Sequence, residues 1–252
     1  MKKITRLLSG VLACLSLQAA AAGQVDVMRA TQPAPVTTLT QVENLSQLIA
    51  NPAIDGQTWW PGTVIAERLA TAAILQQQQQ VITRLQAWSQ SLRADNDLEQ
   101  AAVVDNVSQQ VRNLKVTGRQ IVPLDPDIVR LHPETNRRLE GEYSLWLAQK
   151  PTTVTLFGVL GNSGATSWQP GKDTRDYLQS SARLTGAERN IAQVISPAGQ
   201  VTDVPVAYWN HRYYEAPLGS LVFVGFSSWT LPSAYEDLNQ QIVSLLTHRV
   251  PE

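Results

Sequence analysis

The stretch that decides the fold covers residues 116–130 and reads VTGRQIVPLDPDIVR. It follows a long helical pattern and is rich in the aliphatic and β-branched residues that favour strands. Gly118 allows a backbone bend that other residues resist, and Arg119 places a fixed positive charge with a planar set of donors directly after it. Pro123 and Pro126 have no N–H group, so we expect this strand to lie at a sheet edge or to be interrupted. Arg119 beside the bend is our first candidate for a binding residue.

Two helical segments precede this stretch. Apolar residues recur at steps of three and four from Val64 to Leu92, and again from Leu98 to Leu114. A short polar turn joins the segments, which predicts an antiparallel helical hairpin at about residues 64–115. The glutamine run at residues 76–80 keeps the helical period, so we expect it to be a solvated part of the first helix.

Shorter elements on either side of the hairpin form two similar series. Each series has two extended runs and then a short helix, at residues 44–50 in the first and 174–180 in the second. VPL at 122–124 and VPV at 204–206 are each followed by a loop with an arginine and by a further strand. We therefore predict an α+β protein with an internal repeat, in which the hairpin is inserted into the first copy. The predicted units are residues 23–149, residues 150–229 and a C-terminal amphipathic helix within 230–252.

The N-terminus has the layout of a secretory signal peptide at residues 1–22. A basic start precedes an apolar segment that is too short to span a bilayer, and an Ala-x-Ala site lies before Gly23. The alternative is a lipoprotein signal, because Val-Leu-Ala-Cys ends at Cys14, the only cysteine of the 252 residues. The apolar segment and the Ala-x-Ala site continue beyond Cys14, which favours ordinary cleavage and a periplasmic protein.

The mature chain would carry no cysteine and a modest negative charge. Loss of Lys2, Lys3 and Arg6 leaves 17 Lys and Arg against 21 Asp and Glu, a net charge of −4. This balance does not favour nucleic acid or an anionic membrane as the main partner.

Residues 59–62 read WWPG and form the sharpest local motif. Paired indoles before a Pro-Gly turn can stack on a sugar ring, and they can also fill a small core.

The last helix is open to two interpretations. Its apolar face can dock on the rest of the chain, or it can seek a partner or a membrane.

No motif in the sequence points to catalysis. GNSG at 161–164 is not the nucleophile elbow Gly-x-Ser-x-Gly, and the three histidines lack metal-ligand spacing. Asp125 and Asp127 resemble an acid–base pair for glycoside cleavage, but Asp-Pro-Asp is common in turns. We expect no cofactor, no metal site and no enzymatic activity.

Several longer motifs resemble those of the periplasmic GfcC/YjbG family of capsule and exopolysaccharide operons, nearer to its YjbG branch. They are WWPG at 59–62, VTGR at 116–119, LDPDIVR at 124–130, VAYWNHR at 206–212, and the tail from Leu238 to Pro251. The resemblance implies two β-grasp domains similar to periplasmic domains of polysaccharide exporters, a helical hairpin inserted in the first, and a C-terminal amphipathic helix. It also implies a pocket that contains Arg119.

The expected function is that of a non-catalytic accessory protein in capsule or exopolysaccharide export, a monomer in isolation. It would bind the polysaccharide or export proteins of its operon, with association to an outer-membrane complex through the last helix as one route. The alternative is a periplasmic enzyme that modifies or cleaves the polysaccharide. The candidate ligand-binding residues are Arg119, Trp59, Trp60, Asp125, Asp127 and Arg130.

Overall fold

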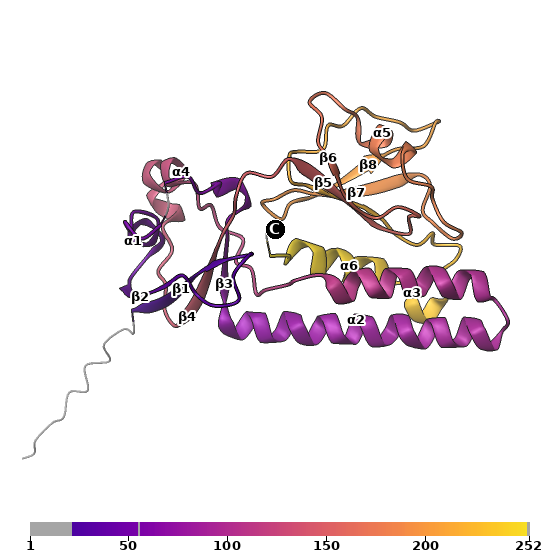
Figure 1. Ribbon diagram of the computed structural model, residues 1–252, viewed down its shortest axis with the longest axis horizontal. Coiled ribbons are helices and arrows are strands. Elements are labelled where there is room, and N and C mark those ends of the chain that lie inside the picture. The colour runs from indigo at the N-terminus through magenta and orange to yellow at the C-terminus, as the bar shows by residue number, and fades with distance from the viewer. Residues whose placement is uncertain (1–21, 55, 251–252) are drawn as a thin grey trace, which may run out of the picture.

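The computed structural model describes residues 22–54 and 56–250, which form an α+β structure with two β-sheets (Figure 1). The first sheet contains β1 (Gly23–Arg29), β2 (Thr37–Val42), β3 (Val64–Glu67) and β4 (Glu142–Leu147), in the order β2-β1-β4-β3. β1 runs parallel to β4, and the other neighbours are antiparallel. Val25 and Val27 are buried whereas Gln24 is exposed, as the period-two alternation predicts.

The second sheet has one more strand. It contains β5 (Thr153–Gly158), β6 (Gly164–Ser167), β7 (Ile191–Ile195), β8 (Val201–Pro205) and β9 (Leu221–Val224), in the order β6-β5-β9-β7-β8. β5 is parallel to β9, and the remaining pairs are antiparallel. All four residues of β9 are buried, which fits its central place in the sheet.

The two sheets share one connectivity. In each sheet an antiparallel hairpin is followed by a short helix, and a later strand returns parallel to the first strand of the hairpin. The short helices are α1 (Leu45–Ile49) and α5 (Thr174–Gln179), whose first turns are capped by the side chains of Asn44 and Asp173. β3 and β7 occupy corresponding positions beside the returning strand. The internal repeat inferred from the sequence is therefore present in the sheet connectivity.

Two long helices follow β3. α2 (Arg68–Ala94) and α3 (Leu98–Asn113) are joined at residues 95–97 and pack against each other (Figure 1). The prediction that the first helix begins at Val64 is wrong, because residues 64–67 form β3 and pair with β4. Val64, Ile65 and Ala66 are buried one after another. Such a short apolar run fits a buried strand and a buried helix equally well.

The described residues form two hydrophobic cores, and α2 and α3 belong to the second. The smaller core joins the first sheet to α1 and to α4 (Pro126–Leu131). The larger core joins the second sheet to α2, α3 and α6 (Leu238–Thr247), which lie along one side of that sheet in Figure 1. Trp88 of α2 contacts Phe226 and Tyr235, with ring centroids 4.8 and 5.5 Å apart. Helices that interrupt the first half of the sequence thus complete the core of the second half.

The glutamine run lies within α2, and one of its side chains connects the two long helices. Gln78 is buried, and its Nε2 donates to the carbonyl oxygens of Val111 (2.8 Å) and Leu114 (2.7 Å). These carbonyls lie at the C-terminal end of α3, where the helix no longer supplies its regular donors, and Val111 O also accepts from Leu114 N at 3.3 Å. The prediction of a solvated run is therefore wrong for Gln78, whose amide binds both carbonyls.

Residues 115–125 do not form a regular strand. Ala66–Arg119 and Val116–Arg249 are isolated bridges, and Gln120 N donates to Ile65 O at 2.8 Å. This confirms the interrupted alternative, since Pro123 and Pro126 cannot donate to a strand ladder. Residues 115–125 still lie beside β3 in the way that β8 lies beside β7. The connection from β3 to these residues is formed by α2 and α3, which therefore occupy the position that the short β7–β8 turn has in the second sheet.

The C-terminal segment begins with a 3-10 helix (Ser233–Tyr235) and continues as α6. Other 3-10 turns are Trp60–Gly62 and Pro133–Thr135. The apolar face of α6, which includes Leu238, Ile242 and Leu245, is buried in the larger core, so in this structure the helix is docked. None of the helices in the described ranges combines the length and the hydropathy needed to cross a bilayer.

Candidate functional site

The motif Thr117-Gly118-Arg119 is held tightly against the start of α2. Gly118 N donates to the Thr71 hydroxyl at 2.9 Å, and the hydroxyls of Thr71 and Thr117 lie 3.2 Å apart. A Cβ atom on Gly118 would lie 2.2 Å from the Thr71 backbone nitrogen, a distance that no side chain tolerates. Glycine is thus required by the close approach of two backbones. The direction in which Arg119 leaves the chain is fixed as a result.

Arg119 reaches from the first half of the molecule to the β7–β8 turn of the second half. Its side chain is 9% exposed, and Nη2 donates to Pro197 O at 2.7 Å. A Cβ atom on Gly199 would lie 3.3 Å from the Arg119 Cζ, so Gly199 leaves room for the guanidinium plane. Arg119 Nε is buried and has no hydrogen-bond partner. One donor of the guanidinium is therefore without an acceptor among the described residues.

The charge of Arg119 is not neutralised by the protein. Within residues 22–54 and 56–250, no Asp or Glu forms an ion pair with it. Burial, and to a smaller extent the positive charge of Arg249, lower the pKa of Arg119 to about 10. The guanidinium stays charged at neutral pH, but the protein supplies little to stabilise it. A bound anion would relieve this cost.

We call the space around this side chain the arginine cavity. It has a volume of about 60 Å³, and its lining includes Arg119, Arg249, Trp59 and Gly219. Among the described residues that line it are two arginines and no Asp or Glu. The volume suits a few water molecules or one carboxylate rather than a sugar ring. The arginine cavity therefore has the size and charge of a site for a small anionic group.

The two adjacent tryptophans lie in different places. Trp59 lines the arginine cavity, where its ring packs over Gly62 and close to Gly219. Trp60 packs against the smaller core and faces a separate hollow of about 440 Å³ that Arg119 also borders. The two indoles therefore do not form a single stacking wall. Trp59 remains a ligand candidate, and Trp60 is partly a core residue.

The other candidates from residues 124–130 are not gathered in the arginine cavity. Asp125 caps α4 by accepting a hydrogen bond from Asp127 N at 2.9 Å, and it borders the hollow beside Trp60. Asp127 and Arg130 form an ion pair with each other at 2.8 Å, and both side chains are 76% exposed. These contacts account for Asp-Pro-Asp as the start of a short helix. They leave no carboxylate pair facing a common space.

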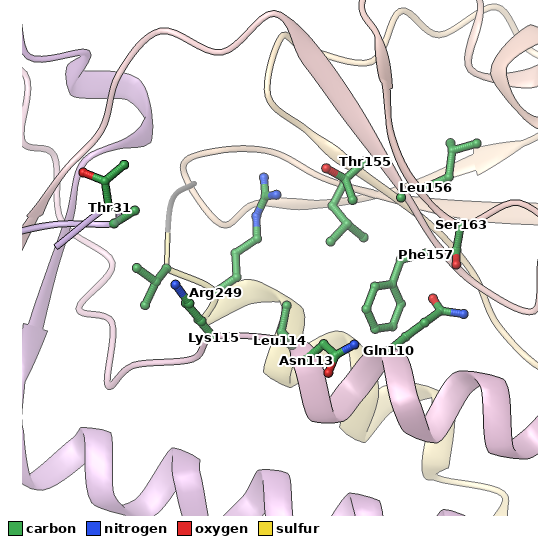
Figure 2. Close-up of a pocket in the computed structure, with 14 residues that line it drawn as sticks. Thr31, Gln110, Asn113, Leu114, Lys115, Thr155, Leu156, Phe157, Ser163 and Arg249 are labelled. Carbon is green, nitrogen blue, oxygen red and sulfur yellow. The ribbon is translucent and has the colours of Figure 1, made fainter. Parts of the chain in front are cut away.

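A larger cleft adjoins the arginine cavity, and the sequence did not reveal it. The cleft has a volume of about 530 Å³ and shares Thr155 and Arg249 with the cavity. Figure 2 shows Lys115, Arg249, Gln110 and Phe157 around it. Its lining comes from β5, from the end of α3, from residues after β1 and from the C-terminal segment. No local pattern marks such residues, because tertiary packing alone brings them together.

The described residues hold no group of three or more His, Cys, Asp or Glu side chains that could bind a metal ion. The closest charged pair that includes a histidine is His211–Asp173, in which Nε2 lies 2.5 Å from Oδ2. Asp173 already caps α5 through its other carboxylate oxygen. This pair fixes a loop to a helix.

Comparison with known proteins gives consistent results over almost the whole chain. The family model "Capsule biosynthesis GfcC, N-terminal" matches residues 21–150, and "Capsule biosynthesis GfcC C-terminal" matches residues 162–251. The chain is also 42% identical over 232 residues to "Uncharacterized protein YjbG" of Escherichia coli (strain K12), and the alignment covers 92% of each chain.

Proposed function

This chain belongs to the GfcC family of capsule biosynthesis proteins, and from this we propose that it is a non-catalytic accessory protein of capsule or exopolysaccharide assembly and export. It acts by binding an acidic group of the polysaccharide in the arginine cavity. A carboxylate of an export protein has the same chemistry and is the second ligand class for the same cavity. One observation carries the proposal: the buried Arg119 Nε has no partner, in a cavity whose described lining contains no acid.

The chemistry of this cavity selects for carboxylate-like groups. A guanidinium presents its donors in a plane, which matches the two oxygens of a carboxylate. Pro197 O already takes one donor, so Arg119 is held in place before a ligand arrives. A neutral sugar would leave the buried charge uncompensated, which makes an acidic sugar the better ligand.

The alternative, an enzyme that cleaves or modifies the polysaccharide, would need Asp125, Asp127 or Glu142 as acid or base, and Glu142 forms an exposed ion pair with Arg68. Asp125 caps a helix, and Asp127 is paired with Arg130 at the surface. Both environments are those of structural groups, and this supports binding without bond cleavage.

We also propose that the two repeated units are β-grasp domains. Their shared order of hairpin, short helix and parallel returning strand supports this.

Substitution of Arg119 tests the binding site. We expect Arg119→Ala to weaken the binding of galacturonate, a simple acidic sugar, by about tenfold or more, because charge-assisted hydrogen bonds are lost. Arg119→Lys keeps the charge without the planar donors, and should fall between wild type and Arg119→Ala. Isothermal titration calorimetry measures the affinities, and staining of the polymer at the cell surface reports the effect on export.

Arg130→Ala is the matched control for this experiment. It removes the same charge from an exposed pair outside the cavity, and should bind galacturonate like the wild type. Equal affinities of Arg119→Ala and wild type would remove Arg119 from the mechanism. An equal loss in Arg130→Ala would show that only net charge matters.

We further propose that the protein is periplasmic and that its signal peptide is cleaved before Gly23, where β1 begins. The intact mass of the protein recovered from the periplasm should correspond to residues 23–252. A lipid-modified chain that begins at Cys14 would contradict this cleavage, and so would a full-length chain confined to the cytoplasm. This proposal rests on residues 1–22, of which 1–21 lie outside the described part of the chain.

A further inference from the structure

The cleft beside the arginine cavity lies where both halves of the molecule meet. Thr31 follows β1 of the first sheet, whereas Phe157 and Ser163 belong to β5 and to the turn after it (Figure 2). Lys115 comes from the segment after α3, and Arg249 from the segment after α6. Its volume of about 530 Å³ lies within the range of about 300–1,000 Å³ that is usual for small-molecule sites. Sites of this kind commonly occupy the contact between two units.

The lining of the cleft combines an apolar surface with a polar rim. Leu114, Leu156, Phe157 and Val250 provide apolar surface, and Thr31, Asn113 and Ser163 provide hydroxyl and amide groups. Lys115 and Arg249 are its charged residues, and its described lining includes no Asp or Glu. The Lys115 side chain forms no ion pair with the described residues. The cleft thus offers apolar contact, hydrogen bonds and positive charge, as an acidic sugar requires.

The cleft and the arginine cavity are neighbouring spaces. Thr155 and Arg249 line both of them, so the cleft lies directly beside the cavity. The cavity, at about 60 Å³, admits a carboxylate but not the sugar ring that carries it. The ring and its neighbours therefore need the adjoining space. The 530 Å³ cleft is large enough to receive them.

We infer that the cleft is a saccharide subsite, so that the protein binds an acidic oligosaccharide with one carboxylate at Arg119 and the adjoining residue between Phe157 and Lys115. This inference rests on the proposed function. It further specifies that the ligand is longer than one sugar and that its acidic groups have a defined spacing. A second acidic group on the chain would lie near the Lys115 ammonium. The protein would then discriminate between polysaccharides by the spacing of their acidic residues.

The experiment compares galacturonic acid, trigalacturonic acid and the neutral maltotriose by isothermal titration calorimetry. We expect the wild type to bind trigalacturonate about tenfold more tightly than galacturonate, because one more sugar makes contacts. Ser163→Trp should narrow the cleft at the turn after β5, and should weaken trigalacturonate more than galacturonate, so that most of this advantage is lost. Lys115→Gln should weaken trigalacturonate about threefold, as loss of a partly exposed ion pair does. Maltotriose should bind more weakly than either acid.

Asn162→Trp is the control for Ser163→Trp, because Asn162 is the exposed neighbour that does not line the cleft. It should keep the full preference for the trisaccharide. A length preference that survives in both Ser163→Trp and Lys115→Gln overturns the inference, as does equal binding of maltotriose and trigalacturonate. Galacturonate binding without any length preference in the wild type overturns the inference alone. If neither acid binds, both the subsite and the proposed function fall.

Discussion

Trp88→Ala should lower the free energy of unfolding by about 3–5 kcal/mol, the usual cost of removing a large buried aromatic side chain. Trp88 is 2% exposed in the larger core. Its ring meets the edge of Phe226 at an interplanar angle of 68° and stacks on Tyr235 at 23°. The substitution removes both contacts and leaves a cavity between α2 and the second half of the molecule. We expect a loss of this size because Trp88 is enclosed by the larger core on the side of the second sheet and α6.

Urea unfolding followed by far-UV circular dichroism measures this loss without relying on tryptophan fluorescence, which the substitution itself changes. Leu69→Ala on the same helix is the control. Leu69 is 79% exposed and should change the free energy of unfolding by less than about 0.5 kcal/mol. A cost below about 1 kcal/mol for Trp88→Ala would show that α2 does not pack on the second sheet as described.

Gly118→Ala should have the second-largest effect, and it should affect stability and binding together. Its Cβ would lie 2.2 Å from Thr71 N and 2.4 Å from Ala70 C, which are backbone atoms that cannot rotate away. Overpacking of this kind costs about 1–3 kcal/mol or more, because helix α2 or residues 117–119 must shift. Either movement displaces Arg119 from Pro197 O. Galacturonate affinity should therefore fall together with the urea midpoint.

Gly56→Ala is the control, since a Cβ at this exposed position meets nothing within 4 Å. It should leave both the urea midpoint and galacturonate affinity unchanged. Gly118→Ala with wild-type stability and affinity would mean that the motif does not press against α2.

The sequence predicted those parts of the fold that depend on neighbouring residues. The short helices predicted at residues 44–50 and 174–180 form as α1 and α5, where Asn44 and Asp173 cap them, and the strand at Thr153–Gly158 lies in a β-branched run. The start of α2 was misplaced because Val64, Ile65 and Ala66 satisfy a helical period and a buried strand alike. Only pairing with β4 decides between them.

The candidate site was predictable to a smaller extent. Arg119 was found because a charge beside a required glycine is a local feature. Its contact with Pro197, however, spans 78 residues, and Arg249 approaches from the far end of the chain. Arg130 was a reasonable candidate from the same motif, but helix geometry pairs it with Asp127 three residues earlier. Long-range packing, which sequence spacing does not encode, determines which of these charges face a ligand.

The position of α2 and α3 has a consequence for how the protein can be divided. Both helices fall within the N-terminal family match at residues 21–150, yet their apolar faces are in the core with the second sheet. A fragment that ends at residue 150 would expose those faces to water, and the complementary fragment would lack one wall of its interior. We therefore expect each half alone to be less stable than the whole chain, although the two halves repeat one connectivity.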